Sequence, residues 1–411
     1  MASDLADQGS LAASIRSLWS NGRGPILLSI SFGWFLVYGL RAAIPALLPQ
    51  IKTTFALDNA AAGLAYSALW VGYAVSQFPA GLLVDRLGER TLLGASMGLT
   101  ALAIVGLAGA PVFGVLVATS GILGLAMGLY GPPRGTLLSA VYDKSDGTAI
   151  GVTLSAGSIG GAVLPFLAGL LVVTIGWRAT LGLTVPLFLL TGLYVWRVVP
   201  HARSAAVGSD GRSVAGDMDG IISGVLTRPV IITVIAVTLL ITSFQGFAAF
   251  FPTYLTEAKG LDQGTAAGLY GLIFLAAAVA QPLAGGVADA YNDRIVLVAS
   301  AAIAALPLFV LPFVSGLIPL AILAVVMGVR LGGYPVTNAY IIRLLPDEVQ
   351  GAAWGLVRTV FFLMSASGPA LVGVLSDYTG FETTFLVLGV VTVLAAVAYA
   401  MLPAPGTYGT R

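Results

Sequence analysis

Long apolar runs, separated by short polar or Pro- and Gly-rich breaks, dominate this chain of 411 residues. Charged residues make up 9% of it, whereas a soluble globular domain carries about 25%. Inside a bilayer the backbone must satisfy its own hydrogen bonds, so only α-helices or closed β-barrels can span it. Apolar runs of about 20 residues indicate helices. The sequence therefore predicts an all-α membrane protein.

Twelve of these runs are predicted to be membrane spans. They are residues 26–48, 60–83, 91–110, 112–141, 148–175, 178–198, 229–252, 264–288, 295–314, 316–344, 351–376 and 383–403. The predicted organisation is a cytoplasmic N-terminal segment (1–24), a six-helix bundle (25–198), a polar cytoplasmic linker (199–228), a second six-helix bundle (229–403) and a cytoplasmic tail (404–411).

The distribution of Lys and Arg predicts the orientation. With both termini in the cytoplasm, the cytoplasmic segments hold twelve of the 19 Lys and Arg residues, the external loops hold three, and four lie within spans. This excess on one side follows the positive-inside rule. No organelle-targeting segment is recognised, so the expected location is the plasma membrane, with many passes and both termini cytoplasmic.

Two halves of the sequence match at a constant offset of 204 residues. The stretch GLLVDRLGER (81–90) aligns with GGVADAYNDR (285–294), and GTAIG (147–151) aligns with GAAWG (351–355). We infer that one unit was duplicated. Two parallel six-helix repeats around a central cavity are an architecture of secondary transporters.

The stretch at 81–90 resembles the G-x-L-x-D-R-x-G-x-R signature of the major facilitator superfamily, and the degenerate copy lies in the matching loop. The resemblance extends from the first span to the twelfth. It implies two pseudo-symmetric six-helix bundles that rock about a central site, which is alternating access. It also implies a gating role for Gly81, Asp85, Arg86, Gly88, Arg90, Asp289, Arg294 and Arg358.

A physical reading supports the gating role. Asp85 is expected at a helix end, where it can face the positive N-terminus of the span that begins near Gly351, and Asp289 can do the same near Gly147. Such contacts would close the cytoplasmic face in an outward-open state. The alternative is that these charges only orient the loops.

The first two spans resemble those of anion:cation symporters and organophosphate antiporters. Those proteins carry an Arg at the position of Arg41 and a Y-x-x-x-Q-x-P-x-G stretch, which here begins at Tyr73. Span five matches the drug:proton antiporter pattern poorly, because Pro165 follows three apolar residues instead of a Gly. An exporter of hydrophobic or drug-like compounds, or a carrier of a neutral solute, is therefore the alternative.

Four arginines lie inside predicted spans, whereas all 18 Asp and Glu residues fall in loops, tails or span ends. A charge at the centre of a lone helix costs about 3 kcal/mol on insertion scales, so such residues usually face a water-filled cavity or a partner. The planar guanidinium binds carboxylate or phosphate oxygens bidentately. Unpaired arginines in a cavity therefore predict an anionic substrate.

Depth along the spans separates these arginines. Arg41 and Arg330 lie near the middle and are the central substrate ligands. Arg134 follows Pro132 and Pro133 and is expected to bind on the inward path or to gate; glycines and a proline at 332–335 interrupt the matching span of the second half. For each arginine the alternative is a structural bond to backbone carbonyls, or snorkelling for Arg358.

Polar and aromatic neighbours are predicted to complete the site: Tyr38, Tyr73, Gln245, Tyr334 and Asn338, with Tyr66 and Trp70 nearby. Aromatic rings with a polar end form walls that pack on a ligand. Each of them is alternatively a helix-packing or interfacial residue.

Other functional classes find little support. The net charge of +1 gives no basic surface for nucleic acid, and the chain has no Cys and a single His, His201, in the linker. No metal, cofactor or catalytic motif is recognised, so an enzyme is not expected. A receptor would need an output domain longer than the polar segments. The prediction is a monomeric secondary transporter of a small organic anion, a carboxylate or phosphorylated metabolite, working in the bilayer with a proton, with sodium or with no coupling ion.

Overall fold

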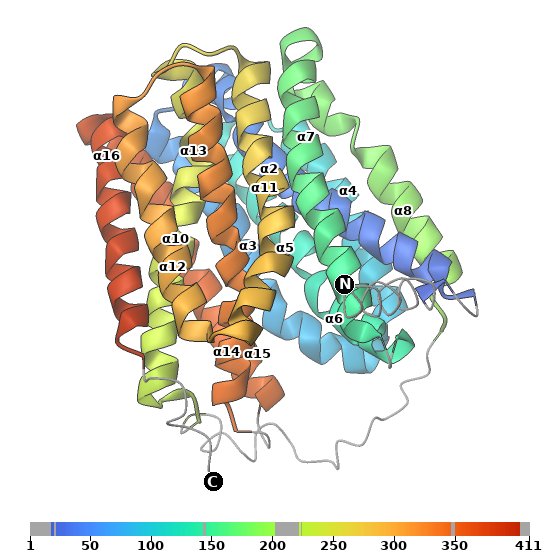
Figure 1. Ribbon diagram of the computed structural model, residues 1–411. Helices are drawn as coiled ribbons and strands as arrows, with labels where there is room; N and C mark the ends of the chain where they lie inside the picture. Colours follow the sequence, from blue (N-terminus) through green and yellow to red (C-terminus); the bar gives the residue numbers. More distant parts are fainter. Residues whose placement is uncertain are drawn as a thin grey trace, which may run out of the picture.

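The computed structural model describes residues 18–19, 22–142, 145–201, 222, 224–346 and 350–402, apart from the side chains of Asp289 and Ala352. Most of the predicted N-terminal segment, linker and tail lies outside these residues, as does the side chain of the predicted gating residue Asp289. The described part of the chain folds into helices joined by short turns (Figure 1), which confirms the all-α class.

The helices form two groups, one from each half of the sequence. The first group contains α2 (Gly24–Phe55), α3 (Asn59–Leu87), α4 (Glu89–Ala108), α5 (Phe113–Gly128), α6 (Gly131–Val141), α7 (Asp146–Gly182) and α8 (Val185–Val198). The second contains α10 (Arg228–Glu257), α11 (Gln263–Ala290), α12 (Asp293–Val310), η3 (Leu311–Phe313), α13 (Leu317–Val329), η4 (Arg330–Gly332), α14 (Gly333–Leu344), α15 (Gln350–Ser365) and α16 (Gly368–Ala400).

Ten helical stretches of the described chain are long and apolar enough to cross a membrane. Two of them, Asp146–Val198 and Ala353–Ala400, contain 53 and 48 residues, far more than the roughly 20 that one crossing needs. Each contains a glycine with positive φ, Gly176 at 74° and Gly380 at 79°. Glycine adopts this conformation without the steric penalty of a Cβ, so the chain turns at these two points. They lie 204 residues apart, the offset of the sequence repeat.

Two other stretches are interrupted at mid-depth. Helix α5 ends at Gly128 and α6 begins at Gly131, immediately before two prolines that lack an N–H for the preceding turn. In the second half the short 3₁₀ helix η4 separates α13 from α14. These interruptions fall where the sequence predicted broken helices, and the second one contains Arg330.

The two groups of helices meet along two seams. In the α3–α16 seam a Cβ at Gly63 would lie only 2.3 Å from the carbonyl oxygen of Pro369. In the α7–α11 seam a Cβ at Gly271 would lie 2.5 Å from the carbonyl oxygen of Ala162. Figure 1 shows α7 beside α11. Small residues allow such close approach of helices in membranes, where van der Waals contact replaces the hydrophobic effect.

The second helix of each half begins with the same cap. The Asp58 carboxylate accepts a hydrogen bond from the Ala61 N–H at 2.7 Å, and the Asp262 carboxylate accepts one from the Thr265 N–H at 2.9 Å. A carboxylate at the N-cap satisfies a free N–H and interacts favourably with the helix dipole. Both capped ends lie at the same side of the molecule, which the predicted orientation makes the external side.

Candidate functional site: a central cavity lined with arginine

A cavity of about 390 Å³ lies between the two groups of helices. Its wall contains all eight residues predicted to bind substrate: Tyr38, Arg41, Tyr73, Arg134, Gln245, Arg330, Tyr334 and Asn338. Arg358, which the sequence assigned to gating, lines the same cavity. The structure therefore brings the four intramembrane arginines to one space. Substrate binding by these residues stays a prediction.

Arg41 lies at the centre of an aromatic cluster and is 9% exposed. Its guanidinium carbon lies 4.7, 4.6 and 5.0 Å from the ring centroids of Tyr38, Trp70 and Tyr73. The Tyr66 hydroxyl donates to the Arg41 carbonyl at 3.1 Å, which ties α3 to α2. Aromatic faces attract a cation electrostatically, most strongly where water is excluded. They stabilise the charge of Arg41 without neutralising it.

Arg134 and Arg330 are also stacked on rings. The guanidinium carbon of Arg134 lies 4.0 Å from the Trp34 ring centroid, and that of Arg330 lies 4.3 Å from the Phe244 ring centroid. Arg330 Nη1 also donates to the carbonyl of Leu240 at 3.4 Å. The bond to a carbonyl is the structural alternative named for these arginines, but it uses only one of the five N–H groups of the guanidinium.

Arg358 completes the set, with its guanidinium carbon 5.6 Å from the Phe362 ring centroid. Arg134 and Arg358 are close enough to interact electrostatically with each other and with Tyr73. Within the described residues, the buried Nε atoms of Arg134, Arg330 and Arg358 have no hydrogen-bond partner. Buried polar groups are normally hydrogen-bonded, so unpartnered donors at a cavity favour a ligand that accepts hydrogen bonds.

Two amides in the wall are also unpartnered. Gln245 is 2% exposed, and neither its Oε1 nor its Nε2 bonds to any described residue. Asn338 Oδ1 likewise lacks a donor in the described part of the chain. Among the residues described, the cavity wall includes no Asp, Glu or His. The site thus combines cations, neutral amides and aromatic rings.

The sequence missed part of the wall, including Trp34, Phe244, Tyr270, Phe274, Gln281 and Phe362. The repeat held the signal for three of them. Tyr66, Trp70 and Gln77 lie 204 residues before Tyr270, Phe274 and Gln281. Trp34, Phe244 and Phe362, which support the arginines, have no such signal, because an apolar helix can turn an aromatic side chain either to lipid or to the interior.

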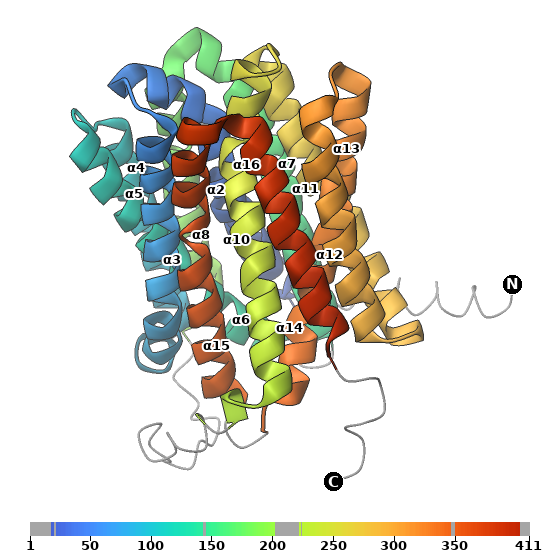
Figure 2. The ribbon, with the colours of Figure 1, turned by 90° about the vertical axis from the view of Figure 1, so that its left-hand side faces the viewer.

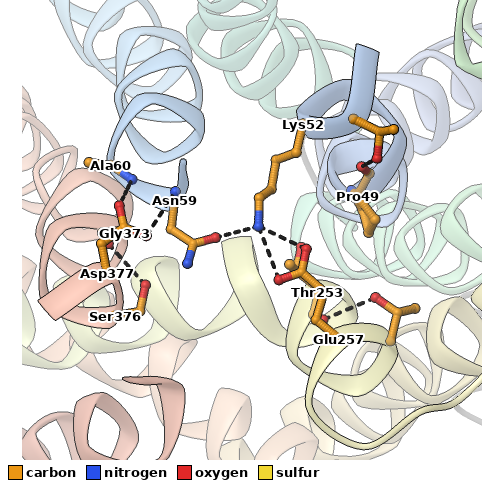
Figure 3. Close-up of polar contacts among 11 residues, drawn as sticks. Pro49, Lys52, Asn59, Ala60, Thr253, Glu257, Gly373, Ser376 and Asp377 are labelled. Atoms are coloured by element: carbon orange, nitrogen blue, oxygen red, sulfur yellow. Dashed lines mark hydrogen bonds and ion pairs between the residues drawn. The ribbon is translucent and has the colours of Figure 1, made fainter. Parts of the chain in front are cut away.

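Polar contacts join the two groups of helices where α2 and α10 end, on the side that the predicted orientation makes external (Figure 3). Lys52 Nζ, at the end of α2, donates to Asn59 Oδ1 at 2.5 Å. It also donates to both carboxylate oxygens of Glu257, at the end of α10, at 2.8 and 3.1 Å. The Lys52 side chain is 11% exposed and that of Glu257 is 44% exposed.

Asp377 of α16 forms a second contact between the groups. One carboxylate oxygen accepts from the Asn59 N–H at 3.1 Å and the other from the Ala60 N–H at 2.8 Å (Figure 3). A carboxylate at the first turn of α3 is favoured by the positive end of the helix dipole. Beside the α7–α11 seam, Gln263 Nε2 of α11 donates to the Ala46 carbonyl of α2 at 2.9 Å. We call these contacts together the outer seal.

The predicted gating motif lies at the opposite end of α3. Gly88 has φ of 76° and joins α3 to α4, while Asp85 and Arg86 are exposed. Arg90 bonds to His201 Nδ1 at 3.0 Å and stacks on Trp196. Helices α14 and α15 of the second group reach this same end (Figure 2).

In the second copy of the motif an asparagine occupies the position of Gly88. Asn292 caps α12 through its side chain, which accepts from the Ile295 N–H at 2.9 Å. Arg294 Nη2 donates to the Ala400 carbonyl, and Arg343 pairs with Asp293 at 2.5 Å. The two copies therefore fix their loops by different contacts.

A family profile described as Major Facilitator Superfamily matches residues 30–276 and 235–410. The chain is 24% identical over 382 residues to an uncharacterized MFS-type transporter, YfnC, of Bacillus subtilis, covering 92% of each chain. It is 23% identical over 409 residues to the hexuronate transporter of the same organism, covering 93% of this chain and 94% of that one. It is 27% identical over 168 residues to a probable hexose phosphate transport protein of Chlamydia muridarum, covering 41% and 37%.

The fold is similar to that of a bacterial homologue of the human lysosomal transporter Spinster, solved in an inward-facing and unoccupied conformation. The TM-score is 0.80 at 15% identity, and the alignment covers 92% of this chain and 96% of the other.

Proposed function

The chain belongs to the major facilitator superfamily, and from that premise we propose that it is a secondary transporter of a small organic anion, a carboxylate or a phosphorylated metabolite. The transport is across the plasma membrane and proceeds by alternating access. The observation that carries the proposal is the cavity itself, whose described wall contains four arginines and no acidic side chain.

Electrostatics explains the choice of an anion. Buried charges need a partner, and these arginines have aromatic faces and unpartnered N–H groups where a carboxylate would otherwise be expected. An anion supplies both the opposite charge and the acceptor atoms. A cationic compound meets four like charges in the cavity wall. A hexuronate and a hexose phosphate, named for two relatives, are both organic anions.

Alternating access follows from the same premise. We propose that the two long helical stretches each cross the membrane twice, turning at Gly176 and Gly380, which makes twelve crossings from ten stretches. The crossings then form two six-helix bundles, 25–198 and 229–403, joined by the linker 199–228, with both termini cytoplasmic. The outer seal breaks when the cavity opens outward, and the motif residues at the opposite end, Asp85 among them, close the cytoplasmic side.

Uptake into proteoliposomes tests the function. The purified protein is reconstituted and given labelled mono- and dicarboxylates, sugar phosphates, a neutral sugar and a lipophilic cation. We expect uptake of one anion class and a fall of about tenfold or more in both Arg41→Gln and Arg330→Gln, because each loses charge-assisted hydrogen bonds.

Arg178→Gln is the matched control. Arg178 lies at the external end, where it stacks on Trp177 and donates to the Ala110 carbonyl. Its substitution should leave the selectivity unchanged. Uptake of the neutral sugar or the cation that survives both cavity substitutions would contradict the anion proposal and support the exporter or neutral-solute alternative.

A further inference from the structure

Repeat-related positions in the cavity carry different chemistry. Gln245 lies 204 residues after Arg41, and Asn338 lies 204 residues after Arg134. All four side chains line the cavity. At each of these two positions the first half supplies a cation and the second half supplies a neutral amide. The second half also supplies Arg330 and Arg358, so the amides add neutral hydrogen-bonding groups to a wall that holds two cations from each half.

The amide at Gln245 requires a particular kind of partner. Both of its polar atoms are buried and have no partner among the described residues, which favours a ligand that supplies a donor and an acceptor at this point. A carboxylate or phosphate dianion only accepts hydrogen bonds, whereas a hydroxyl group both donates and accepts. The conclusion does not depend on which amide atom is oxygen, because neither atom has a partner. Asn338 Oδ1 adds a second acceptor without a donor.

The surroundings of Gln245 suit a hydroxyl-bearing group. Its neighbour in the chain, Phe244, packs under the guanidinium of Arg330, which keeps N–H groups free beyond the one bonded to Leu240. Gln245 and Arg330 both line the cavity, so a ligand with several hydroxyl groups can accept from Arg330 and donate to Gln245. The other three cations all interact with Tyr73, which stacks with Arg41 and interacts electrostatically with Arg134 and Arg358.

We propose that the substrate is a hydroxylated organic anion with its charged group among Arg41, Arg134 and Arg358 and its hydroxyl groups against Gln245. Gln245 is then a specificity-determining residue that selects for hydroxyl groups and against a second charge. This inference rests on the proposed function, because it assumes that the cavity binds an anion.

Calorimetric measurement of the affinity of the purified protein for matched pairs of ligands tests this proposal. Glucuronate is compared with hexanoate, and glucose 6-phosphate with hexyl phosphate; adipate serves as the dianion. We expect the wild type to bind the hydroxylated member of at least one pair about 10- to 100-fold more tightly, since a site built for a hydroxyl rejects the analogue that lacks it. Gln245→Met, similar in length but without hydrogen-bonding groups, should reduce this ratio to near one.

Gln245→Arg tests, by gain of function, whether an arginine at the repeat position of Arg41 changes the preference between ligands with one and two charges. It adds a fifth arginine to the cavity wall, at the repeat position of Arg41, so the affinity for adipate relative to glucuronate should rise by about tenfold. Gln77→Met is the matched control, because Gln77 is also buried but donates to the Gly128 carbonyl outside the cavity wall. Its ratios should equal those of the wild type. Where Gln245→Met does not elute as a folded protein, Gln245→Leu replaces it.

The outcomes separate the two proposals. Tight binding of an anion that is lost in Arg41→Gln, with a ratio unchanged in Gln245→Met and Gln245→Leu, overturns the role of Gln245 and leaves the anion transporter standing. Equal affinity of the wild type for the hydroxylated and the unhydroxylated member of each pair also overturns the role of Gln245 and leaves the anion transporter standing. Binding of none of the anions by the wild type overturns both proposals.

Discussion

The two seams between the helix groups are built alike in their packing and differently in their electrostatics. Both the α3–α16 seam and the α7–α11 seam contain glycines pressed against a backbone carbonyl of the opposite helix. At the external end of the first seam, the Asp377 carboxylate accepts two N–H groups from the first turn of α3. Beside the second seam, the hydrogen bond described above is that of a neutral amide, from Gln263 of α11 to the Ala46 carbonyl of α2.

This difference separates two tasks. The glycine contacts are close approaches of backbone to backbone between the two groups and set how closely the helices pack in either seam, so they contribute to stability. The Asp377 contact joins one helix end to the other group of helices, so it contributes to the closed state of the external side. Packing should therefore control stability, and the charged contact should control the balance between conformations.

The largest effect is expected for packing in the α7–α11 seam. In Gly271→Ala the new methyl would lie 2.5 Å from the Ala162 carbonyl oxygen, a backbone atom that cannot rotate away. We expect a loss of about 2–3 kcal/mol in the free energy of unfolding, with a lower midpoint of thermal unfolding in detergent. Gly268→Ala, one turn earlier, meets Phe166 at 3.4 Å, an ordinary contact, and should unfold like the wild type. Equal midpoints for the two variants would refute this account of the seam.

An intermediate effect is expected for the charged contact. Asp377→Ala removes both bonds to α3 and should raise the external accessibility of the cavity by about tenfold, since a hydrogen bond to a charged group contributes about 1.5–3 kcal/mol. The natural sequence lacks cysteine, so Ser158→Cys in the cavity wall gives a single labelling site. The measurement is the rate of its modification by an impermeant maleimide added outside whole cells.

Asp262→Ala is the control for that measurement, because Asp262 caps α11 within its own half. Its labelling rate should match that of the Ser158→Cys background. An unchanged rate in Asp377→Ala would show that the charge does not hold the external side closed.

The smallest effect is expected for Lys52. Its partner Glu257 is 44% exposed, and such ion pairs contribute about 0–1 kcal/mol. Lys52→Met should therefore raise the labelling rate of Ser158→Cys by about twofold, and added salt should reduce the difference from the background. The exchange Lys52→Glu with Glu257→Lys should restore the original rate. A larger effect for Lys52→Met than for Asp377→Ala would reverse the order of the two contacts.

The sequence predicted the helical architecture well, because apolar length, breaks and the repeat are all local signals. It placed a boundary between 175 and 178, where Gly176 turns the chain, and broken helices at 131–133 and 332–335. The unpaired arginines predicted the main features of the cavity, because a charge within a membrane normally faces a partner or a water-filled cavity. Arg358 was assigned to gating from the sequence. Its depth along the span did not show which way its side chain points, and the structure places it in the cavity wall.

The outer seal was beyond prediction from one sequence. Lys52 and Glu257 are 205 residues apart, and Asp377 is 318 residues from its partner Asn59, so nothing local marks them as neighbours. The sequence also did not predict which aromatic rings stack on each arginine, for a related reason. In a span that is apolar on all sides, periodicity does not separate the face toward lipid from the face toward the cavity.

The arginine-lined cavity also makes membrane voltage a variable in the transport cycle. Moving one elementary charge through 100 mV changes its energy by about 2.3 kcal/mol. The empty cavity carries the charge of its arginines, and a bound anion cancels part of it. We therefore expect an inside-negative potential to act with different force on the empty and the occupied carrier, so that the cell's electrical state biases which of the two steps limits turnover.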